Sequence, residues 1–373
     1  MKTASEVETL ERIAIQPGIE SFDFQLPPGL EASMPPEARG LARDQVRLMV
    51  SYVNSGRIVH TQFRSLPDFL EPGDLLVINT SGTLKASLPA RSQNGTPLEL
   101  HISTHLPDGS FSIELRRPSP EGSQPYYDAS PDEILSLPAR GSARLVAPYL
   151  GNQRQRPYPQ NGKIRLWIAA LQLPEPFDDY LEAYGSPIRY KYVPDGWPIS
   201  LYQNVYTTEN GSAEMASAGR AFTPKLITRL VSHNVHFSPL ILHAGVASLE
   251  NHEPPYEEYF CVPVETARAV NSARVSGCRV IAVGTTSVRA LESVSGFDGR
   301  VSAAEDWTDR IITPQDGLRV VDGLLTGLHE PRSTHLALLE ALAGAHHIRQ
   351  TYRAAIEQGY LWHEFGDLHL ILP

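Results

Sequence analysis

The sequence has few cysteines and no long apolar segment. Only Cys261 and Cys278 occur among the 373 residues, so the chain can form neither a disulfide framework nor a zinc site built on several thiolates. No stretch approaches the roughly 20 apolar residues that cross a bilayer, and the N-terminal residues contain no apolar core of signal-peptide length. These absences predict a cytoplasmic protein that is not associated with a membrane.

The sequence also has fewer basic than acidic residues. Lysine and arginine total 32 against 42 aspartates and glutamates, which gives a formal net charge of −10. Proteins that bind nucleic acid irrespective of sequence usually present a basic surface, so this composition argues against such binding and leaves only a local basic patch open. The histidines do not have the spacing of a zinc-binding helix, and no metal is expected.

The order of patterns along the chain predicts two structural units. Residues 81–167 contain short alternating stretches separated by turn residues, which is typical of a small antiparallel β-barrel. Residues 1–80 and 168–373 contain apolar strands that alternate with amphipathic helices, which is typical of an α/β domain. We therefore expect a mainly parallel sheet with flanking helices and an inserted antiparallel β-barrel domain.

One stretch, Arg279–Ser293, combines a buried strand with the start of a helix. The apolar run Val280–Val283 ends at Gly284, and hydroxyl residues follow where a helix should begin. The N–H groups at a helix start favour a carboxylate, a phosphate or a ribose hydroxyl. Alternatively, the hydroxyls only cap the helix and the glycine only makes the turn. The candidate residues are Gly284, Thr285, Thr286 and Ser287.

A second candidate, His243, directly follows the strand predicted to end at Leu242. In parallel sheets, ligands bind beyond the carboxyl ends of the strands, where a histidine can act as an acid, a base or a hydrogen-bond donor. The alternative is a buried histidine bonded to a backbone carbonyl. Gly245 lies in the loop after His243, at the same edge of the sheet. Gly219 lies in a segment rich in small residues, which either allows a ligand to approach the backbone closely or is simply a loop.

Arg289 and Glu292 lie three residues apart and share one face of the predicted helix. They either form a weak surface ion pair or leave Arg289 free to reach a bound carboxylate. We include both residues in the candidate ligand site.

The segment His329–His335 lies between a predicted strand and a helix. Ser333 or Thr334 is the expected helix cap, and Glu330 is free to face a ligand. These residues and His329 either bind a ligand or only form the turn and the cap.

At these residues the chain resembles the S-adenosylmethionine:tRNA ribosyltransferase-isomerase family of queuosine biosynthesis. Residues 279–293 match the signature of that family almost residue for residue, and weaker matches follow in the same order along the chain. The weaker matches include Phe22–Pro27, Pro72–Asn79, Leu201–Tyr206, Ala218–Gly219, Leu242–Gly245, Leu325–His329, Ser333–Thr334 and Phe365–Asp367. The resemblance implies an α/β domain with an inserted β-barrel.

The resemblance also implies a reaction. S-adenosylmethionine would be a substrate that donates its ribosyl portion to the aminomethyl group of a 7-deazaguanine in the tRNA anticodon, while adenine and methionine leave. The sulfonium acidifies the neighbouring carbon, so a base can start the reaction, and the leaving adenine needs a proton donor. His243 is our candidate for an acid or base. No metal or redox cofactor would be required, and a monomer is favoured.

The chain departs from the family pattern at three positively charged or titratable positions. Two arginines of the family motifs are absent from the segments Asn79–Thr83 and Ala86–Leu88. A histidine of the family motif is replaced by Ala221, and Glu330 occurs in the segment before the cap. These differences suggest that the substrate or the chemistry has changed while the S-adenosylmethionine pocket at residues 284–292 remains.

Three hypotheses therefore stay open. The first is the family reaction on tRNA, which predicts a basic patch formed by Lys85, Arg91, Arg220, Arg349 and Arg353. The second is a divergent enzyme that uses S-adenosylmethionine on a small molecule or only cleaves it. The third is a relative that binds RNA or a metabolite without catalysis.

Overall fold

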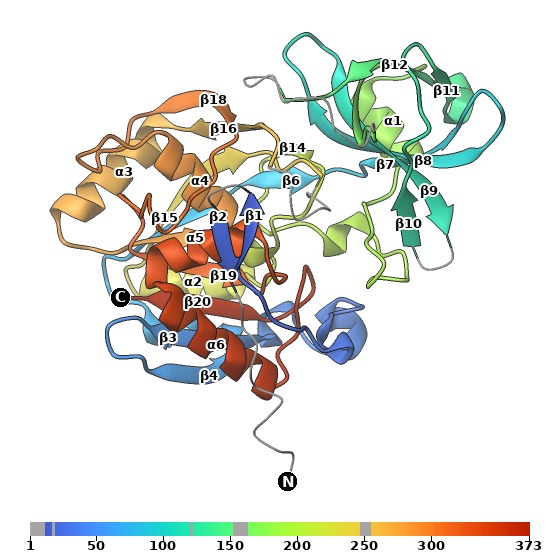
Figure 1. Ribbon diagram of the computed structural model, residues 1–373. Coiled ribbons are helices and arrows are strands. Elements are labelled where there is room, and N and C mark those ends of the chain that lie inside the picture. The colour runs from blue at the N-terminus through green and yellow to red at the C-terminus, as the bar shows by residue number, and fades with distance from the viewer. Residues whose placement is uncertain (1–11, 17–18, 120–121, 152–162, 247–254) are drawn as a thin grey trace.

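The computed structural model describes residues 12–16, 19–119, 122–151, 163–246 and 255–373. These residues form an α/β unit around a nine-stranded sheet and a separate β-barrel that lies at one end of the molecule (Figure 1). No helix in the described ranges is long and apolar enough to cross a membrane.

The nine-stranded sheet is mixed, so the expectation of a mainly parallel sheet is not confirmed. Its strands, in spatial order, are β18 (Ala304–Thr308), β16 (Glu258–Val262), β15 (His236–Leu242), β5 (Leu75–Asn79), β17 (Val280–Val283), β19 (Gly323–Gly327), β20 (Leu368–Leu372), β3 (Arg47–Tyr52) and β4 (Ile58–Gln62). The four strands β15, β5, β17 and β19 are parallel to one another. The pairs β18–β16, β16–β15, β19–β20 and β3–β4 are antiparallel.

The connections explain two of the antiparallel pairs, β3–β4 and β19–β20. A short turn joins β3 to β4, and such a hairpin can only be antiparallel. Two successive helices, α5 (Thr334–Ala343) and α6 (Ala345–Glu357), connect β19 to β20. A single helix would return the chain to the edge of the sheet where β19 begins, and the next strand would then be parallel to β19. The second helix brings the chain back to the edge where β19 ends, so β20 runs antiparallel to β19.

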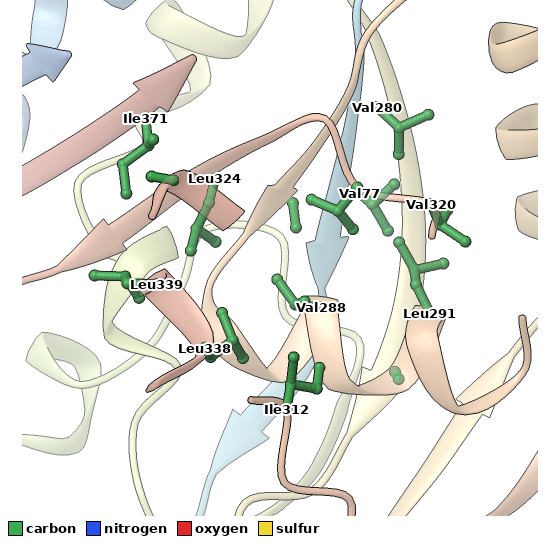
Figure 2. Close-up of a cluster of buried hydrophobic side chains, with 14 of the residues drawn as sticks. Val77, Val280, Val288, Leu291, Ile312, Val320, Leu324, Leu338, Leu339 and Ile371 are labelled. Atoms are coloured by element: carbon green, nitrogen blue, oxygen red, sulfur yellow. The ribbon is translucent and has the colours of Figure 1, made fainter. Parts of the chain in front are cut away.

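The remaining helices of the α/β unit are α2 (Pro224–Ser232), α3 (Val264–Val275) and α4 (Thr285–Ser293). Figure 2 shows Val288 and Leu291 of α4 beside Val77 and Val280 of the central strands, and all four side chains are buried. Full burial of an aliphatic side chain of this size stabilises the fold by about 1.5–3 kcal/mol. This packing fixes the start of α4 above the end of β17.

The barrel is a closed ring of six antiparallel strands, as the sequence predicts. In spatial order its strands are β8 (Pro97–His105), β9 (Phe111–Ser119), β13 (Leu166–Gln172), β12 (Ser142–Pro148), β11 (Ile134–Ser136) and β7 (Ser87–Arg91), which pairs back with β8. A short strand, β10 (Gly122–Pro125), extends β9. Helix α1 (Phe177–Tyr184) buries Tyr180 and Leu181 in the core of the barrel.

The shorter elements complete the chain. The strands β1 (Arg12–Gln16) and β2 (Ile19–Phe22) form a hairpin, and β6 (Ser81–Thr83) pairs in parallel with β14 (Glu209–Ser212). The 3-10 helices are η2 (Pro28–Leu30), η3 (Pro36–Arg39), η4 (Arg43–Gln45), η5 (Phe63–Phe69), η6 (Pro138–Arg140), η7 (Ile199–Leu201) and η8 (Ser217–Gly219).

A buried histidine pair predicts how stability depends on pH. The hydroxyl of Ser51 lies 2.8 Å from Nε2 of His369 and 2.9 Å from Nε2 of His347. Burial lowers the pKa of His369 to about 3, whereas a histidine in an unfolded chain titrates near about 6.5. Between these values the unfolded chain binds more protons, so the unfolding free energy falls as pH decreases below about 6.5, by up to about 1.4 kcal/mol per pH unit for this histidine.

We expect His369→Gln to reduce this slope in urea unfolding experiments performed between pH 7 and pH 4. The exposed His233 provides the control, because His233→Gln should leave the slope unchanged. An identical slope in wild type and His369→Gln would contradict the prediction.

Candidate functional site

Four chain segments meet where the parallel strands end. His243 follows β15, Asn79 ends β5, Gly284 follows β17 and Gly327 ends β19. Because neighbouring strands lie about 4.8 Å apart, this edge spans about 14 Å from β15 to β19. The structure therefore brings the segments around His243, Gly284 and His329 to one edge of the sheet, where ligands bind in α/β proteins.

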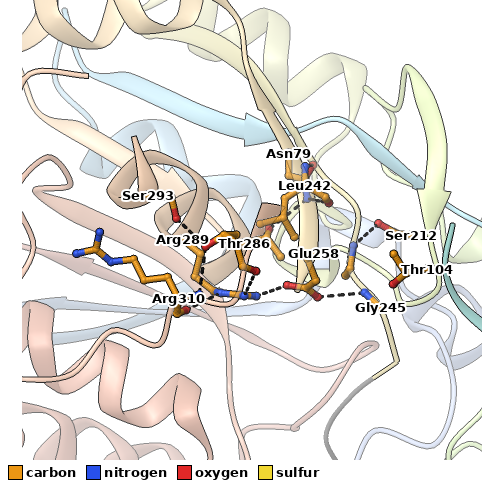
Figure 3. A network of polar contacts seen from close by, with 12 residues as sticks. Asn79, Thr104, Ser212, Leu242, Gly245, Glu258, Thr286, Arg289, Ser293 and Arg310 are labelled. Atoms are coloured by element: carbon orange, nitrogen blue, oxygen red, sulfur yellow. Dashed lines mark hydrogen bonds and ion pairs between the residues drawn. The ribbon is translucent and has the colours of Figure 1, made fainter. Parts of the chain in front are cut away.

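The side-chain amide of Asn79 joins three of these segments (Figure 3). Its Nδ2 donates to the carbonyl of Leu242 at 2.8 Å and to Oγ1 of Thr286 at 3.3 Å, and its Oδ1 accepts from the backbone N–H groups of Leu242 and Ser81. The amide is buried and all of these bonds are internal. Asn79 adds to the residues expected from the sequence, and its only signal there is a polar residue at the end of an apolar strand.

His243 belongs to a short hydrogen-bonded chain of side chains. Its Nδ1 lies 2.7 Å from Oγ of Ser81, which lies 2.6 Å from Oγ of Ser212. The ring stacks on Tyr259 with centroids 5.5 Å apart, and Nε2 lies 3.7 Å from Oε1 of the exposed Glu209. Nothing in the sequence marks the two serines, because they become neighbours of His243 only when β6 pairs with β14.

The electrostatic environment keeps the imidazole of His243 neutral. Burial lowers its pKa, and Glu209 opposes this shift only in part. A neutral imidazole held at Nδ1 can accept a proton at Nε2 or donate one, depending on its tautomer. A side chain at Gly211 would have its Cβ 2.4 Å from this ring, so a glycine is needed there for the histidine to keep its position.

Small residues cover the ends of β17 and β19. Gly284 has a φ of 90°, and a Cβ built on it would lie 3.5 Å from Cβ of Ala218. A Cβ on Gly219 would lie 1.8 Å from the hydroxyl of Tyr206, and one on Gly245 would lie 2.8 Å from Oγ of Ser103. Each glycine is therefore required by a left-handed backbone or by close packing. The contact between Ala218 and the turn also places η8 directly over the start of α4.

The hydroxyls at the start of α4 do not cap it. Gly284 is the N-cap residue and provides no side-chain bond. Ser287 donates to the carbonyl of Val283 at 2.9 Å, and Thr285 is buried. Of these three residues, Thr286 has the hydroxyl that accepts a hydrogen bond from Asn79. This bond places Thr286 at the candidate site.

Arg289 does not lie free at this site. Its guanidinium donates to the carboxylate of Glu258 and to the carbonyls of Arg310 and Thr308, the latter two at 3.1 Å. Oε1 of Glu258 in turn accepts from the backbone N–H of Gly245 at 3.0 Å (Figure 3). Arg289 thus connects α4 to the loop that follows His243.

Glu292 does not pair with Arg289, which corrects the surface ion pair considered above. Its side chain is completely buried and accepts hydrogen bonds from the backbone N–H groups of Arg319, Val320 and Val321. A buried carboxylate is satisfied by several N–H donors in this way. Its contacts tie α4 to the segment before β19.

The segment after β19 places one histidine inward and one carboxylate outward. His329 Nε2 lies 2.8 Å from Oγ1 of Thr326, and its ring stacks on His335 with centroids 4.6 Å apart. Its enclosed position lowers the pKa of His329 well below the ordinary histidine value. Glu330 is exposed, with Oε1 3.8 Å from Nδ1 of His363.

The start of α5 is not capped by a side chain. Ser333 occupies the N-cap position without a side-chain capping bond, and Thr334 is the first helical residue. Both residues are partly exposed beside the His329 segment. Among the described residues, no group of three or more histidine, cysteine or acidic side chains is arranged to hold a metal ion.

The positions that depart from the family pattern are packed closely. A Cβ on Gly82 would lie 2.3 Å from Oδ1 of Asn210 and 2.5 Å from Cγ2 of Thr207, so no longer side chain fits there. Ser87 is buried in β7, and the methyl group of Ala221 lies in the core.

The expected basic patch is not assembled. Arg220 is only 4% exposed and pairs with Glu37 at 2.7 Å, and Lys85 pairs with Glu182 at 2.7 Å. Arg91 lies on β7 of the barrel, while the other two arginines lie on α6 at the far side of the α/β unit (Figure 1). This prediction is wrong because spacing in the sequence does not reveal which cations are used in internal ion pairs.

Comparison with known proteins identifies the family. The model of the family described as queuosine biosynthesis protein matches residues 19–371. The chain is similar to S-adenosylmethionine:tRNA ribosyltransferase-isomerases from Thermotoga maritima (34% identity), Moorella thermoacetica (35%) and Thermus thermophilus (36%). Each alignment covers 95% of this chain and 99% of the relative.

The structure is also similar to a crystal structure of S-adenosylmethionine tRNA ribosyltransferase from Thermotoga maritima. The two share 30% sequence identity and superpose with a TM-score of 0.50, over 94% of this chain and 99% of the other. Similarity over nearly the full length of both chains, in sequence and in structure, leads to one conclusion: the chain belongs to the queuosine biosynthesis protein family.

Proposed function

We propose that this protein transfers and isomerises the ribosyl portion of S-adenosylmethionine onto the aminomethyl group of a 7-deazaguanine in tRNA. The curated relatives are named for this class of reaction and match the chain almost from end to end. The observation that carries the proposal is the hydrogen-bonded chain Ser212–Ser81–His243 at the carboxyl edge of the parallel strands. It provides a neutral, oriented imidazole at the place where α/β proteins bind their ligands.

In this proposal S-adenosylmethionine lies along the edge between β15 and β19. The turn at Gly284 and the facing small residue Ala218 allow a ligand to approach the backbone closely, and Thr286 presents a hydroxyl. Gly219 and Gly245 border the same edge. Arg289 and Glu292 act indirectly, because their polar groups hold α4 in position and do not face the ligand.

His243 is the proposed base. The sulfonium of S-adenosylmethionine acidifies the carbon next to it, and Nε2 of the neutral imidazole can take a proton from that carbon. Ser81 fixes the ring through Nδ1, and Glu209, 3.7 Å from Nε2, favours the imidazolium that forms. The amine of the acceptor forms a C–N bond to the ribosyl portion and gives up a proton, while the adenine leaves with the electron pair of its bond and takes up a proton. The methionine sulfur leaves with the electron pair of the C–S bond, which is replaced at that carbon by a bond to an oxygen of the ribosyl portion.

A second candidate acceptor is a small molecule. The packed position of Gly82 and the ion-paired Arg220 leave fewer cations for an RNA backbone than the family pattern implies. The protein would then release adenine from S-adenosylmethionine without tRNA.

The first test measures adenine by chromatography after incubation with S-adenosylmethionine, with and without tRNA that carries the aminomethyl-deazaguanine. We expect adenine only with the tRNA, and we expect His243→Gln to lower kcat by about 10²- to 10⁴-fold because the base is lost. Since burial lowers the pKa of His243, kcat/KM should fall only when the pH drops below about 6.5.

His233→Gln changes an exposed histidine on the end of α2 and should retain full activity. Adenine release that does not need tRNA would support the small-molecule acceptor. If no adenine forms under either condition, catalysis is excluded, and the hypothesis of a relative that binds without catalysis remains.

A second test concerns the pair Arg289–Glu258, whose side chains are 12% and 14% exposed. Glu258→Ala leaves a nearly buried guanidinium without its carboxylate, so we expect the unfolding free energy to fall by about 3–5 kcal/mol. The loop at Gly245 also loses its acceptor, so the affinity for S-adenosylmethionine should fall in calorimetric titrations.

The pair Arg144–Asp132 provides a matched control because its side chains are 53% and 80% exposed. Arg144→Ala should change the unfolding free energy by no more than about 1 kcal/mol. Equal effects of the two substitutions would show that Glu258 has no special structural role.

A further inference from the structure

A carboxylate outside the residues discussed so far has one oxygen without a protein partner. Glu364 accepts a hydrogen bond at Oε1 from the hydroxyl of Tyr192 at 2.8 Å. Its Oε2 is shielded from solvent and has no hydrogen-bond partner among the described residues. Enclosed carboxylate oxygens are normally satisfied, so an unsatisfied one indicates a position that a ligand, a proton or a water completes.

This carboxylate lines a narrow hollow next to the candidate site. The hollow is bordered by Ser217, Gly327 and Glu364, and Arg220 and Ala221 also contribute to its wall. Gly327 ends β19, and Ser217 belongs to η8, which covers the turn at the start of α4. The hollow therefore borders the end of β19, at one end of the edge on which the substrate is placed. Ala221, which stands where the family motif has a histidine, leaves the wall without a titratable group at that point.

The backbone beside Glu364 is held in an unusual conformation. His363 has a φ of 73°, in the left-handed region that residues other than glycine rarely adopt. Its ring stacks on Tyr192 with centroids 3.9 Å apart, and its nitrogens face Glu31 at 3.3 Å and Glu330 at 3.8 Å. These contacts stabilise a strained backbone, and strain of this kind is concentrated at functional sites.

The enclosed position of Glu364 favours its protonated form. Burial raises the pKa of its carboxyl group, and the negative charge of Glu330 raises it further. The backbone N–H of Glu364 itself, the nearby His363 and the hydrogen bond from Tyr192 lower the pKa and oppose this shift only in part. Arg220, on the same wall, is neutralised by its pair with Glu37. Arg43 also borders the hollow. Its Nε lies 3.4 Å from Oε1 of Glu37, and its guanidinium donates to the carbonyl of Gln203.

We propose that Glu364 is the catalytic acid that protonates the adenine as it leaves S-adenosylmethionine, an inference that rests on the function proposed above. The bond between the ribosyl carbon and the adenine breaks with its electron pair going to the adenine. A lone pair of the ring oxygen forms a second bond to that carbon. The proton on Oε2 moves to an adenine nitrogen, which leaves neutral adenine and a carboxylate that regains its proton from solvent.

His329 is less suited to this role although it lies at the end of the same strand. Its Nε2 is engaged with Thr326, and its low pKa leaves it without a proton to give at neutral pH. Glu364 has the free oxygen, and a carboxyl group with a raised pKa is a typical general acid.

The test compares kcat for adenine release across pH in the wild type, Glu364→Gln and Glu364→Asp, with S-adenosylmethionine affinity measured by calorimetry. We expect the wild-type kcat to fall as the pH rises and the carboxyl group loses its proton. Glu364→Gln keeps the shape of the side chain but cannot transfer a proton. It should lower kcat by at least about 10²-fold, remove this fall, and leave the affinity unchanged, and Glu364→Asp should restore part of kcat.

Two further variants separate proton transfer from structure. Tyr192→Phe removes the hydrogen bond that favours the carboxylate, so it should shift the fall in kcat to higher pH. Glu357→Gln removes an exposed carboxylate on α6 and should leave kcat unchanged.

Full kcat in Glu364→Gln, a loss confined to affinity, or an unchanged pH profile in Tyr192→Phe would overturn the inference while the proposed function stands. Lack of adenine release by the wild type would overturn both.

Discussion

The arrangement of the site depends on the buried amide of Asn79. This side chain ends the central strand β5 and makes hydrogen bonds with both backbone groups of Leu242 and with Thr286. A buried amide without partners costs about 1–3 kcal/mol, so the ends of β15 and β5 and the start of α4 must keep their relative positions. The turn at Ser81 is held by the same amide, and Ser81 orients His243. One polar side chain thus positions the proposed base relative to the proposed ligand pocket.

The β-barrel contributes to the same site through the loop after β15. The hydroxyl of Ser103, on barrel strand β8, accepts from the backbone N–H of Val246 at 3.1 Å. The preceding residue, Gly245, donates to Glu258, which is fixed by Arg289 of α4. The loop is therefore held by the barrel on one side and by the α/β unit on the other. A change in the position of the barrel would be transmitted to the residues that follow His243.

Their surroundings shift the pKa values of the titratable groups along the edge in opposite directions. Burial keeps His243 and His329 neutral, whereas burial favours the protonated form of Glu364. Pairs of groups whose pKa values are moved apart in this way provide a base and an acid at the same pH. The proposed reaction needs both, because one proton leaves the carbon beside the sulfonium and another is delivered to adenine.

Much of the local structure was determined by the sequence itself. Apolar runs and turn residues predict the strands β5 and β17, the helix after Thr285 and the β-barrel, because each follows from short-range periodicity. The same patterns place His243 and His329 at strand ends. Only the tertiary structure decided that Arg289, Glu292 and Arg220 are used internally, that Ser81 and Ser212 reach His243, and that β20 runs antiparallel to β19. These features depend on which distant segments pack together, and the energy of a charge or a hydroxyl is set by its partners in space, which no local pattern in the chain records.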